Sequence, residues 1–403
     1  MNRTGIFFIG ASGYIATAVI AGALAMRKGL CGSSGMVTEL PQFAGLSLVD
    51  PASFAFGGWD IRRSSPLESA RNFFLSSQLP SGILPAIEAD LAEAGQNIYP
   101  GISTNCGRSI EHICSPSGQD RNAALGVQVM RLRRDIQEFR ERNSLDCVVV
   151  VNLASTEPPI EELPSHASIG GLEMCIEEDR SSELRASTLY TYAAILEGCP
   201  YINFTPSNAA LLPALIRLAE ERGVPVMGSD GKTGETLVKS ALIPMFLLRN
   251  LEVLSWEGFN ILGNMDGMVL SDPENKESKI RTKDSLLPKA LGYSPHSSVH
   301  IDYVPSLDDQ KTAWNFIHFR GFLSTKMSLQ FIWQGYDSIL AAPLVLDLAR
   351  LSELARRRGE SGLMRHLASF FKAPEGVEEQ LLHEQAGMLF KYAQDARQNG
   401  VHT

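Results

Sequence analysis

Hydrophobic and polar positions alternate between two kinds of segment in the first half of the chain. Short apolar runs, typical of strands buried on both faces of a parallel sheet, are separated by longer runs with helical periodicity. The strand-like runs are 6–9, 147–152, 201–204 and 224–227, and the helical runs are 120–141, 183–197 and 208–222. Regular alternation of this kind predicts an α/β fold with a doubly wound, mostly parallel sheet.

The pattern changes after about residue 236. Segments 253–262, 299–304 and 314–333 are typical of strands and have fewer helical runs between them. A mixed α+β unit is therefore expected there. From about Asp337 the pattern is helical again, over 340–357, 362–371 and 377–397.

Composition and charge narrow the class of protein. The 403 residues are 44% hydrophobic and 20% charged, which excludes a disordered, collagen-like or disulfide-scaffold protein. At roughly 150 residues per domain, the length predicts two or three folding units. The net charge is −9 without a long run of one sign, which argues against general binding to nucleic acid or anionic lipid. A small-molecule enzyme is the expected class.

Neither a zinc site, a His-built metal centre nor a membrane segment is expected from the sequence. The six cysteines form no CxxC pair and the eight histidines are scattered, so no redox motif, zinc site or His-built centre is indicated. Residues 5–26 carry no charge, which raises the alternative of a membrane span or signal peptide. That run divides into a strand-like GIFFIG and a glycine-interrupted helical stretch. We therefore expect a cytoplasmic protein with no membrane contact.

A glycine loop lies between the first strand and the first helix. Missing side chains at Gly10 and Gly13 let the backbone approach a pyrophosphate, which the helix N-terminus stabilises through its unpaired N–H groups. The spacing is GxxGxxA rather than GxGxxG, and a strand–turn–helix without a ligand is the alternative. In this context the loop predicts dinucleotide binding by Gly10, Ala11, Ser12, Gly13, Tyr14 and Ile15.

A second glycine-rich loop, GSDGKTGET, spans residues 228–236. Glycines and hydroxyl residues beside Lys232 at a helix N-terminus form an anion site, because several N–H donors converge and the ammonium adds charge. It is not a Walker loop, since the glycine that would precede GKT by five residues is missing. An ordinary helix start capped by Asp230 or Thr233 is the alternative.

The third motif is LGNMDG at 262–267, followed by a polar stretch at 272–283. Lys279 and Lys283 are four residues apart on one helical face. Their mutual repulsion in a partly desolvated site would lower an ammonium pKa toward neutrality, which makes a lysine a usable proton donor and acceptor. A solvated polar loop is the alternative.

Taken in order, these motifs resemble those of the myo-inositol-1-phosphate synthases, also called inositol-3-phosphate synthases. The resemblance runs from Gly10 to about residue 390 and is strongest from 200 to 350. The matching segments are FGGWDI (56–61), ASTE (154–157), YINFTPSN (201–208), GSDGKTGETLVKS (228–240), LGNMDG (262–267), SKIRTK (278–283), 304–311, DSILAAPLVLD (337–347) and KAP (372–374).

The resemblance implies an NAD-dependent isomerase that converts D-glucose 6-phosphate to 1L-myo-inositol 1-phosphate, a step of myo-inositol and phospholipid biosynthesis. In the family, C5 of the sugar is oxidised, a proton leaves C6, the enolate attacks the C1 aldehyde, and the resulting ketone is reduced again. Each step moves a proton or stabilises an oxyanion in a site closed to water. A cytoplasmic homotetramer of bacterial or archaeal type is implied.

The same resemblance implies a domain plan and a set of site residues. A Rossmann-like NAD-binding domain, 1–236 with 337–403, is interrupted by a catalytic and tetramerisation domain at 237–336, with the site between them. The implied catalytic residues are Lys279, Lys283, Lys311, Lys372, Asp230, Asn264 and Asp266. The implied cofactor ligands are the first glycine loop with Asp60, Ala154, Ser155, Thr156, Asp230, Asp309, Asp337 and Ser338. The substrate phosphate is expected at Thr233, Gly234, Glu235, Thr236, Lys283 and Lys311.

Departures from the family pattern keep two alternatives open. Glu235 stands where many members carry Gln, and a carboxylate beside a phosphate is unfavourable unless Lys232, Lys283 or Lys311 neutralises it. The first glycine loop also lacks an Asn pair usual in the family. A relative that cyclises another phosphorylated sugar, or a non-catalytic NAD-binding regulator, is therefore also considered. The metal remains unknown: whether a monovalent or divalent cation assists is open, although Asn264 and Asp266 offer oxygen ligands.

Overall fold

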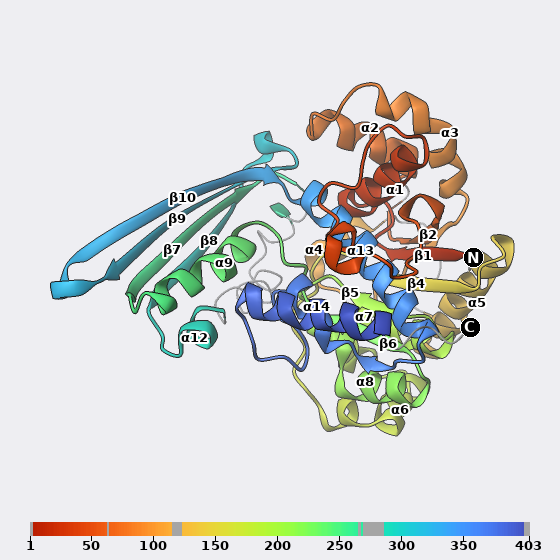
Figure 1. Ribbon diagram of the computed structural model, residues 1–403. Helices are drawn as coiled ribbons and strands as arrows, with labels where there is room; N and C mark the ends of the chain where they lie inside the picture. Colours follow the sequence, from red (N-terminus) through yellow and green to blue (C-terminus); the bar gives the residue numbers. More distant parts are fainter. Residues whose placement is uncertain (1–2, 63, 115–122, 265–266, 269–285, 399–403) are drawn as a thin grey trace.

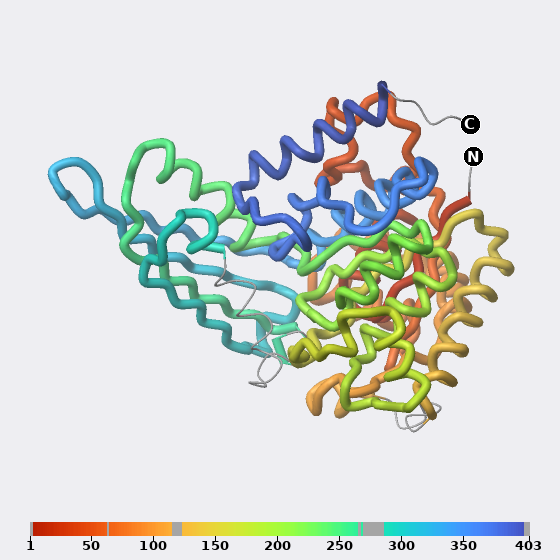
Figure 2. Tube along the Cα trace, turned by 90° about the horizontal axis from the view of Figure 1, so that it is seen from below, coloured from red at the N-terminus to blue at the C-terminus, as the bar shows by residue number. Residues whose placement is uncertain are grey.

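The protein contains two sheets of different kinds, which Figure 1 shows beside each other. The structure is a computed structural model in which residues 3–62, 64–114, 123–264, 267–268 and 286–398 are described. A seven-stranded sheet lies within a thick layer of helices. A four-stranded sheet extends away from it, which is clearest in Figure 2.

The seven-stranded sheet is parallel throughout and has the order β11-β6-β5-β4-β1-β2-β3. All six residues of β1 are buried, as are those of β4, because helices cover both faces. The strands are β1 (Thr4–Ile9), β2 (Ala55–Asp60), β3 (Ile98–Pro100), β4 (Cys147–Asn152), β5 (Tyr201–Asn203), β6 (Pro225–Gly228) and β11 (Gly362–Leu363). The predicted doubly wound α/β fold is confirmed.

Two hydrophobic cores hold the helices on the two faces of this sheet. One core includes α1 (Tyr14–Arg27), α2 (Pro66–Ser76), α3 (Ile83–Gly95) and α13 (Asp337–Arg357). The other includes α5 (Leu125–Arg142), α6 (Ile169–Glu177), α7 (Ala186–Leu196) and α8 (Pro213–Glu221). The short helix α4 (Arg108–Ile113) and the last helix, α14 (Leu382–Gln398), also belong to the part of the protein around the parallel sheet. The sheet therefore has its strand ends, rather than its faces, available for a ligand.

The four-stranded sheet has the order β10-β9-β7-β8 and is mixed, because only β7 and β8 run parallel. Its strands are β7 (Glu252–Leu262), β8 (His296–Tyr303), β9 (Gln310–Arg320) and β10 (Lys326–Tyr336). One face packs on α9 (Gly234–Leu248) and α12 (Leu286–Leu291) through Phe246, Trp256 and Leu287. The opposite face alternates with it along each strand and is more exposed.

Some predicted elements differ from the structure for identifiable reasons. The run 314–333 is not one strand but a hairpin, which reverses at the short helix Phe322–Ser324 where Leu323 takes a positive φ of 58°. The run 362–371 is not an α-helix: β11 and the 3-10 helix Arg365–Phe370 occupy it, and α14 begins at Leu382 rather than near 377. One predicted domain boundary falls inside α9 and the other coincides with the start of α13. The division into domains stays a prediction.

Candidate active site

A cavity of about 440 Å³ opens at the carboxyl ends of the parallel strands, next to the loops that follow β1 and β4. In open α/β sheets this is where ligands bind, at the point where the strand order reverses. Many of the predicted site residues line it, namely Gly10, Ser12, Gly13, Tyr14, Ile15, Asp60, Ala154, Ser155, Thr156, Asp230, Thr233, Asn264, Asp337, Ser338 and Lys372. Among the described residues predicted for the site, Ala11, Gly234, Glu235, Thr236, Asp309 and Lys311 are not part of its wall.

The first glycine loop passes close to the loop after β4. Gly10 has a φ of +86°, and a Cβ on it would lie 3.2 Å from backbone atoms of Ala154, so a side chain would be strained and crowded. Its N–H donates to the carbonyl of Trp59 at 2.9 Å. Gly13 is the N-cap of α1 and has no side chain to satisfy the first N–H groups of that helix. The loop thus has the geometry that a pyrophosphate needs.

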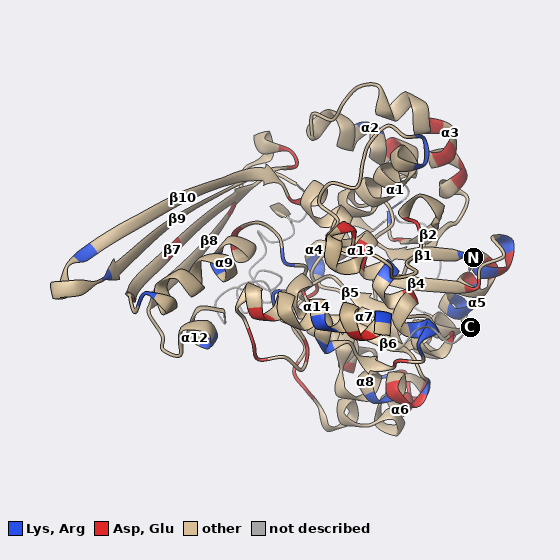
Figure 3. Ribbon diagram, in the orientation of Figure 1, with Lys and Arg blue, Asp and Glu red and all other residues tan. Residues whose placement is uncertain are grey.

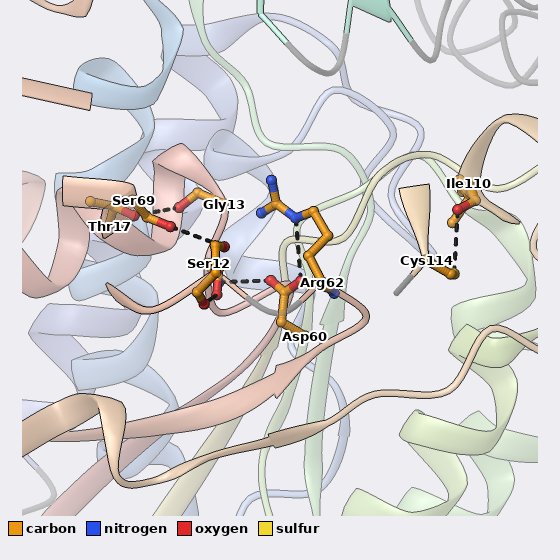
Figure 4. A network of polar contacts seen from close by, with 9 residues as sticks. Ser12, Gly13, Thr17, Asp60, Arg62, Ser69, Ile110 and Cys114 are labelled. Atoms are coloured by element: carbon orange, nitrogen blue, oxygen red, sulfur yellow. Dashed lines mark hydrogen bonds and ion pairs between the residues drawn. The ribbon is translucent and has the colours of Figure 1, made fainter. Parts of the chain in front are cut away.

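Asp60, at the end of β2, is held from two sides (Figure 4). Its Oδ2 accepts a hydrogen bond from the Ser12 N–H at 2.8 Å. Its Oδ1 accepts from the Arg62 N–H at 2.8 Å and from Arg62 Nε at 3.3 Å. A carboxylate offers about four acceptor positions, so about one remains for a ribose hydroxyl. Arg62 could not be predicted as a site residue from sequence, because an isolated Arg after a strand belongs to no motif.

A small apolar pocket lies beyond Asp60 in the same cavity. Ile61 packs on Cys106 and Ile110, and all three belong to the cavity wall together with Ile102. Such a surface suits the flat face of an adenine ring, which needs apolar contact. These residues come from loops and from the short helix α4, and they have no periodicity that a sequence pattern could detect.

At the other end of the cavity, Lys372 and Asp230 form a buried pair. Lys372 Nζ donates to Asp230 Oδ1 at 2.9 Å, and the Lys372 N–H donates to the Asp230 carbonyl at 2.7 Å. Both side chains are below 10% exposed, at 9% and 5%. The second glycine loop and the segment after Phe371 are thereby fixed to each other, with an ammonium and a carboxylate in the cavity wall.

Lys232 of the same loop points away from this site. Its Nζ donates to Gln385 of α14, and it does not line the cavity. Burial lowers the pKa of its ammonium to about 7. The predicted contribution of Lys232 to anion binding is therefore not supported by its position.

Lys311 and Asp309, at the start of β9, occupy two polar clusters beside the cavity. Lys311 Nζ donates to Asp337 Oδ2 at 2.8 Å. Asp309 is 1% exposed and accepts from the hydroxyls of Ser338 at 3.0 Å and Ser77 at 3.2 Å, and from Asn264 Nδ2 at 3.4 Å. Burial raises the pKa of the Asp309 carboxyl to about 6, and these hydrogen bonds oppose the shift. Asp309 thus joins Asn264 and Ser338 behind the cavity wall.

The charge of Glu235 is neutralised, but by a lysine that the sequence analysis did not name. Lys239 Nζ lies 2.9 Å from Glu235 Oε1, and the two side chains are 3% and 2% exposed. The same ammonium lies 5.7 Å from the ring centre of Trp256. Glu235 is buried against the four-stranded sheet, Thr236 is buried as well, and neither lines the cavity. The i, i+4 spacing on α9 is the signal that could have identified this pair.

Three predicted site residues, Lys279, Lys283 and Asp266, lie outside the described residues. Within the described ranges, no group of three or more His, Cys, Asp and Glu side chains is arranged to hold a metal ion. The cation, with Asn264 and Asp266 as its expected ligands, stays a prediction. No helix in the described part of the chain combines the length and the apolar character that crossing a membrane requires.

The comparison with protein families decides the classification. The model of the myo-inositol-1-phosphate synthase family, a group of NAD-binding proteins, matches residues 4–391. The chain belongs to this family. An inositol-3-phosphate synthase of Bacteroides thetaiotaomicron is 34% identical over 93% of this chain and 90% of its own length. An inositol-3-phosphate synthase of Dictyostelium discoideum is 29% identical over 88% of this chain and 75% of its own length.

Solved structures have the same fold. The inositol-3-phosphate synthase of Caenorhabditis elegans matches with a TM-score of 0.87 at 24% identity, covering 100% of this chain and 87% of its own. A myo-inositol-1-phosphate synthase-related protein of Thermotoga maritima matches with a TM-score of 0.80 at 25% identity, covering 98% and 99%. As a family member, this synthase is an NAD-dependent isomerase that forms an inositol phosphate from glucose 6-phosphate.

Proposed function

We propose that this synthase binds NAD along the cavity and cyclises D-glucose 6-phosphate to 1L-myo-inositol 1-phosphate at the end formed by Asp230 and Lys372. The observation that carries the proposal is that one cavity joins a glycine loop and a ribose-binding acid to a buried ammonium–carboxylate pair. The dinucleotide supplies the chemistry of taking a hydride from C5 and returning it to the ring ketone. The residues supply binding, orientation and proton transfer.

The Lys372–Asp230 pair is suited to a proton at the C5 oxygen. An ammonium with three donors can keep its bond to Asp230 and still donate to a substrate oxygen. In a nearly dry wall, its charge acts strongly on an oxyanion. Lys279, which lies outside the described residues, is proposed as the acid/base nearest the same oxygen, and Asn264 and Asp266 are proposed to orient the reacting groups.

The phosphate is proposed to lie at the N-terminus of α9, against Thr233, Gly234 and Lys311. Thr233 is the N-cap of α9 and makes no side-chain cap, so the first N–H groups are suited to an anion. Lys311 is held in place by Asp337 at 2.8 Å. Lys283 is proposed as a second cation. Glu235 does not oppose the phosphate because Lys239 neutralises it.

The test is a product assay with purified protein, NAD⁺ and glucose 6-phosphate. We expect an inositol phosphate without net accumulation of NADH. Lys372→Met should lower kcat about a hundredfold or more with NAD⁺ affinity nearly unchanged, whereas Lys391→Met, at an exposed site on α14, is the matched control. Accumulated NADH would indicate an ordinary dehydrogenase. Retained NAD⁺ binding without turnover on glucose 6-phosphate or other sugar phosphates would favour the regulator.

We also propose a homotetramer in which copies of this chain pack on the open face of the four-stranded sheet. His300, Phe259, Trp314 and Ile332 form a row across all four strands of that face. Phe259 and Ile332 are 38% and 65% exposed, and exposed apolar patches mark contact surfaces. Charged residues are sparse on these strands and frequent on the helices of the parallel sheet (Figure 3).

We propose a cytoplasmic location for the protein. All six cysteines are free thiols, and most of them are buried. Free thiols are typical of a reducing compartment. Fractionation of the producing cells would test this, with the activity expected in the soluble cytoplasmic fraction.

A further inference from the structure

Trp333 on β10 has a buried indole N–H with no hydrogen-bond partner. The other three tryptophans each have one: Trp59 Nε1 donates to Asp135 at 2.9 Å, Trp256 Nε1 to Asn315 at 2.7 Å and Trp314 Nε1 to Gln330 at 3.3 Å. A buried Trp N–H normally finds a partner, because leaving it unpaired is unfavourable. An unpaired donor in this position therefore points to an acceptor that the chain itself does not supply.

Two glycines lie beside this nitrogen. A Cβ on Gly234, the first residue of α9, would lie 3.9 Å from Trp333 Nε1, and a Cβ on Gly335 would lie 3.7 Å from it. Alternation along β10 places Trp333 and Gly335 on the same face of the strand, toward α9. The indole N–H therefore lies in an enclosed position next to the N-terminus of α9, where neither glycine has a side chain that could accept its hydrogen bond.

An ion pair and the N-terminus of α9 lie beside the same position. The point that a Cβ of Gly234 would occupy is 3.8 Å from Lys311 Nζ and 3.2 Å from Asp337 Oδ1. Lys311 and Asp337 are paired at 2.8 Å, so the carboxylate is neutralised there. The N-terminus of α9 adds N–H donors that Thr233 does not cap. Because the ion pair has no net charge, the uncapped N-terminus of α9 is the feature that favours an anion as the acceptor.

We propose that Trp333 Nε1–H donates a hydrogen bond to an oxygen of the substrate phosphate, which makes Trp333 a substrate-binding residue of this synthase. The inference rests on the proposed function and adds to it a neutral donor in the phosphate site. A phosphate has several strong acceptor oxygens, so it can contact Lys311, the α9 N-terminus and Trp333 at once. An indole N–H donates and cannot accept, so it selects for an acceptor at this position.

Trp333→Phe tests the proposal, because it removes the N–H and keeps a ring in place. We expect the KM for glucose 6-phosphate to rise about tenfold, the loss typical of a hydrogen bond to a charged group. The kcat and the NAD⁺ dissociation constant should change little, and inorganic phosphate should inhibit the variant less. Tyr192→Phe on α7, which removes a hydroxyl donor that already has Glu173 as its partner at 3.1 Å and does not line the cavity, is the control and should leave KM unchanged.

A second variant keeps the proposal testable if Trp333→Phe does not fold. Gly335→Ala places a methyl group beside the indole nitrogen and should also raise the KM without weakening NAD⁺ binding. An unchanged KM in both variants would overturn the role of Trp333, provided that Lys311→Met still raises the KM. If Lys311→Met leaves the KM unchanged as well, the phosphate site of the proposed function fails together with this inference.

Discussion

At the scale of single residues, the Glu235–Lys239 pair explains how a carboxylate is tolerated near the expected phosphate. Both side chains are almost completely buried, so each charge depends on the other. Their i, i+4 spacing on α9 brings them together on one helical face. The pair is directed toward the four-stranded sheet, where Trp256 lies under the ammonium.

Breaking this pair from the lysine side should affect both stability and substrate binding. Lys239→Met leaves the Glu235 carboxylate buried without its partner, which should lower the free energy of unfolding by about 3 kcal/mol. It should also raise the KM for glucose 6-phosphate, because an uncompensated carboxylate repels the phosphate. Denaturant unfolding and steady-state kinetics measure the two effects, with Lys326→Met at an exposed site as the control.

Adding Glu235→Gln to Lys239→Met separates the effect of the unpaired charge from the effect of the lost packing of the Lys239 side chain. The double variant contains no unpaired charge at this position, so both KM and stability should return most of the way toward the wild type. Failure of the second substitution to restore either property would mean that Lys239 acts through its contact with Trp256 instead. Glu235→Gln alone should not lower the KM, since the carboxylate is already neutralised.

At the scale of elements, the strands that were predicted from sequence are those with the simplest environment. β1 and β4 are buried throughout and mostly apolar because helices cover both of their faces. β2 was not predicted because it contains Gly57 and Gly58. A Cβ on Gly57 would lie 2.8 Å from the ring of Phe139, and a Cβ on Gly58 would lie 2.3 Å from the carbonyl of Phe8. Close approach of neighbours thus requires glycines that obscure the strand pattern.

Some residues of the candidate site could likewise be predicted from sequence, and others could not. Gly10 could be placed from sequence because its loop joins a strand to a helix, whereas Asp230 and Lys372 were predicted for the site only through the resemblance to the family. The Arg62 contact with Asp60 and the orientation of Trp333 could not be predicted. Both depend on how distant segments approach in space, through the end of β2 and the register of β10, which no local pattern encodes.

Asp309 accepts hydrogen bonds from residues at the ends of several elements, and its carboxyl makes the stability of the protein depend on pH. Its partners follow α2, follow β7 and begin α13. An unfolded Asp has a pKa of about 4, whereas burial raises that of Asp309 to about 6. Between these values the folded state keeps a proton that the unfolded state has lost. Stability from this group therefore falls as the pH rises from about 4 to 6 and stays lower above that.

Asp309→Asn should reduce the dependence of stability on pH, because an amide stays neutral at every pH and is close in shape to the protonated carboxyl. The stability of the variant minus that of the wild type should be more favourable at pH 7.5 than at pH 4.5. Denaturant midpoints of both proteins at the two pH values measure this difference. Asp347, whose pKa burial also raises to about 6, contributes with the same sign, so some slope should remain. Asp302→Asn at an exposed site on β8 should reproduce the wild-type curve, and an unchanged slope in Asp309→Asn would assign the effect to other groups.

At the scale of the whole molecule, each of the two sheets positions a different set of candidate site residues. The parallel sheet presents the glycine loop, Asp60 and the Lys372–Asp230 pair at its carboxyl end. The four-stranded sheet carries Lys311 and Trp333, the proposed phosphate ligands, on the face that packs against α9. Its opposite face makes none of these contacts and is the face proposed for packing between copies.

The proposed packing of copies on that open face predicts a change of mass when the face is charged. Ile332 is 65% exposed and lies directly across from Trp314, which lies across from Phe259. Ile332→Asp should therefore turn the tetramer into smaller species, measured by light scattering after size-exclusion chromatography, because a buried charge without a partner opposes association. Leu75→Asp, at a leucine that is 81% exposed near the end of α2, adds the same charge away from the sheet and should leave the mass unchanged. A monomeric wild type, or an Ile332→Asp variant that keeps the mass of a tetramer, would exclude this face as the contact between copies.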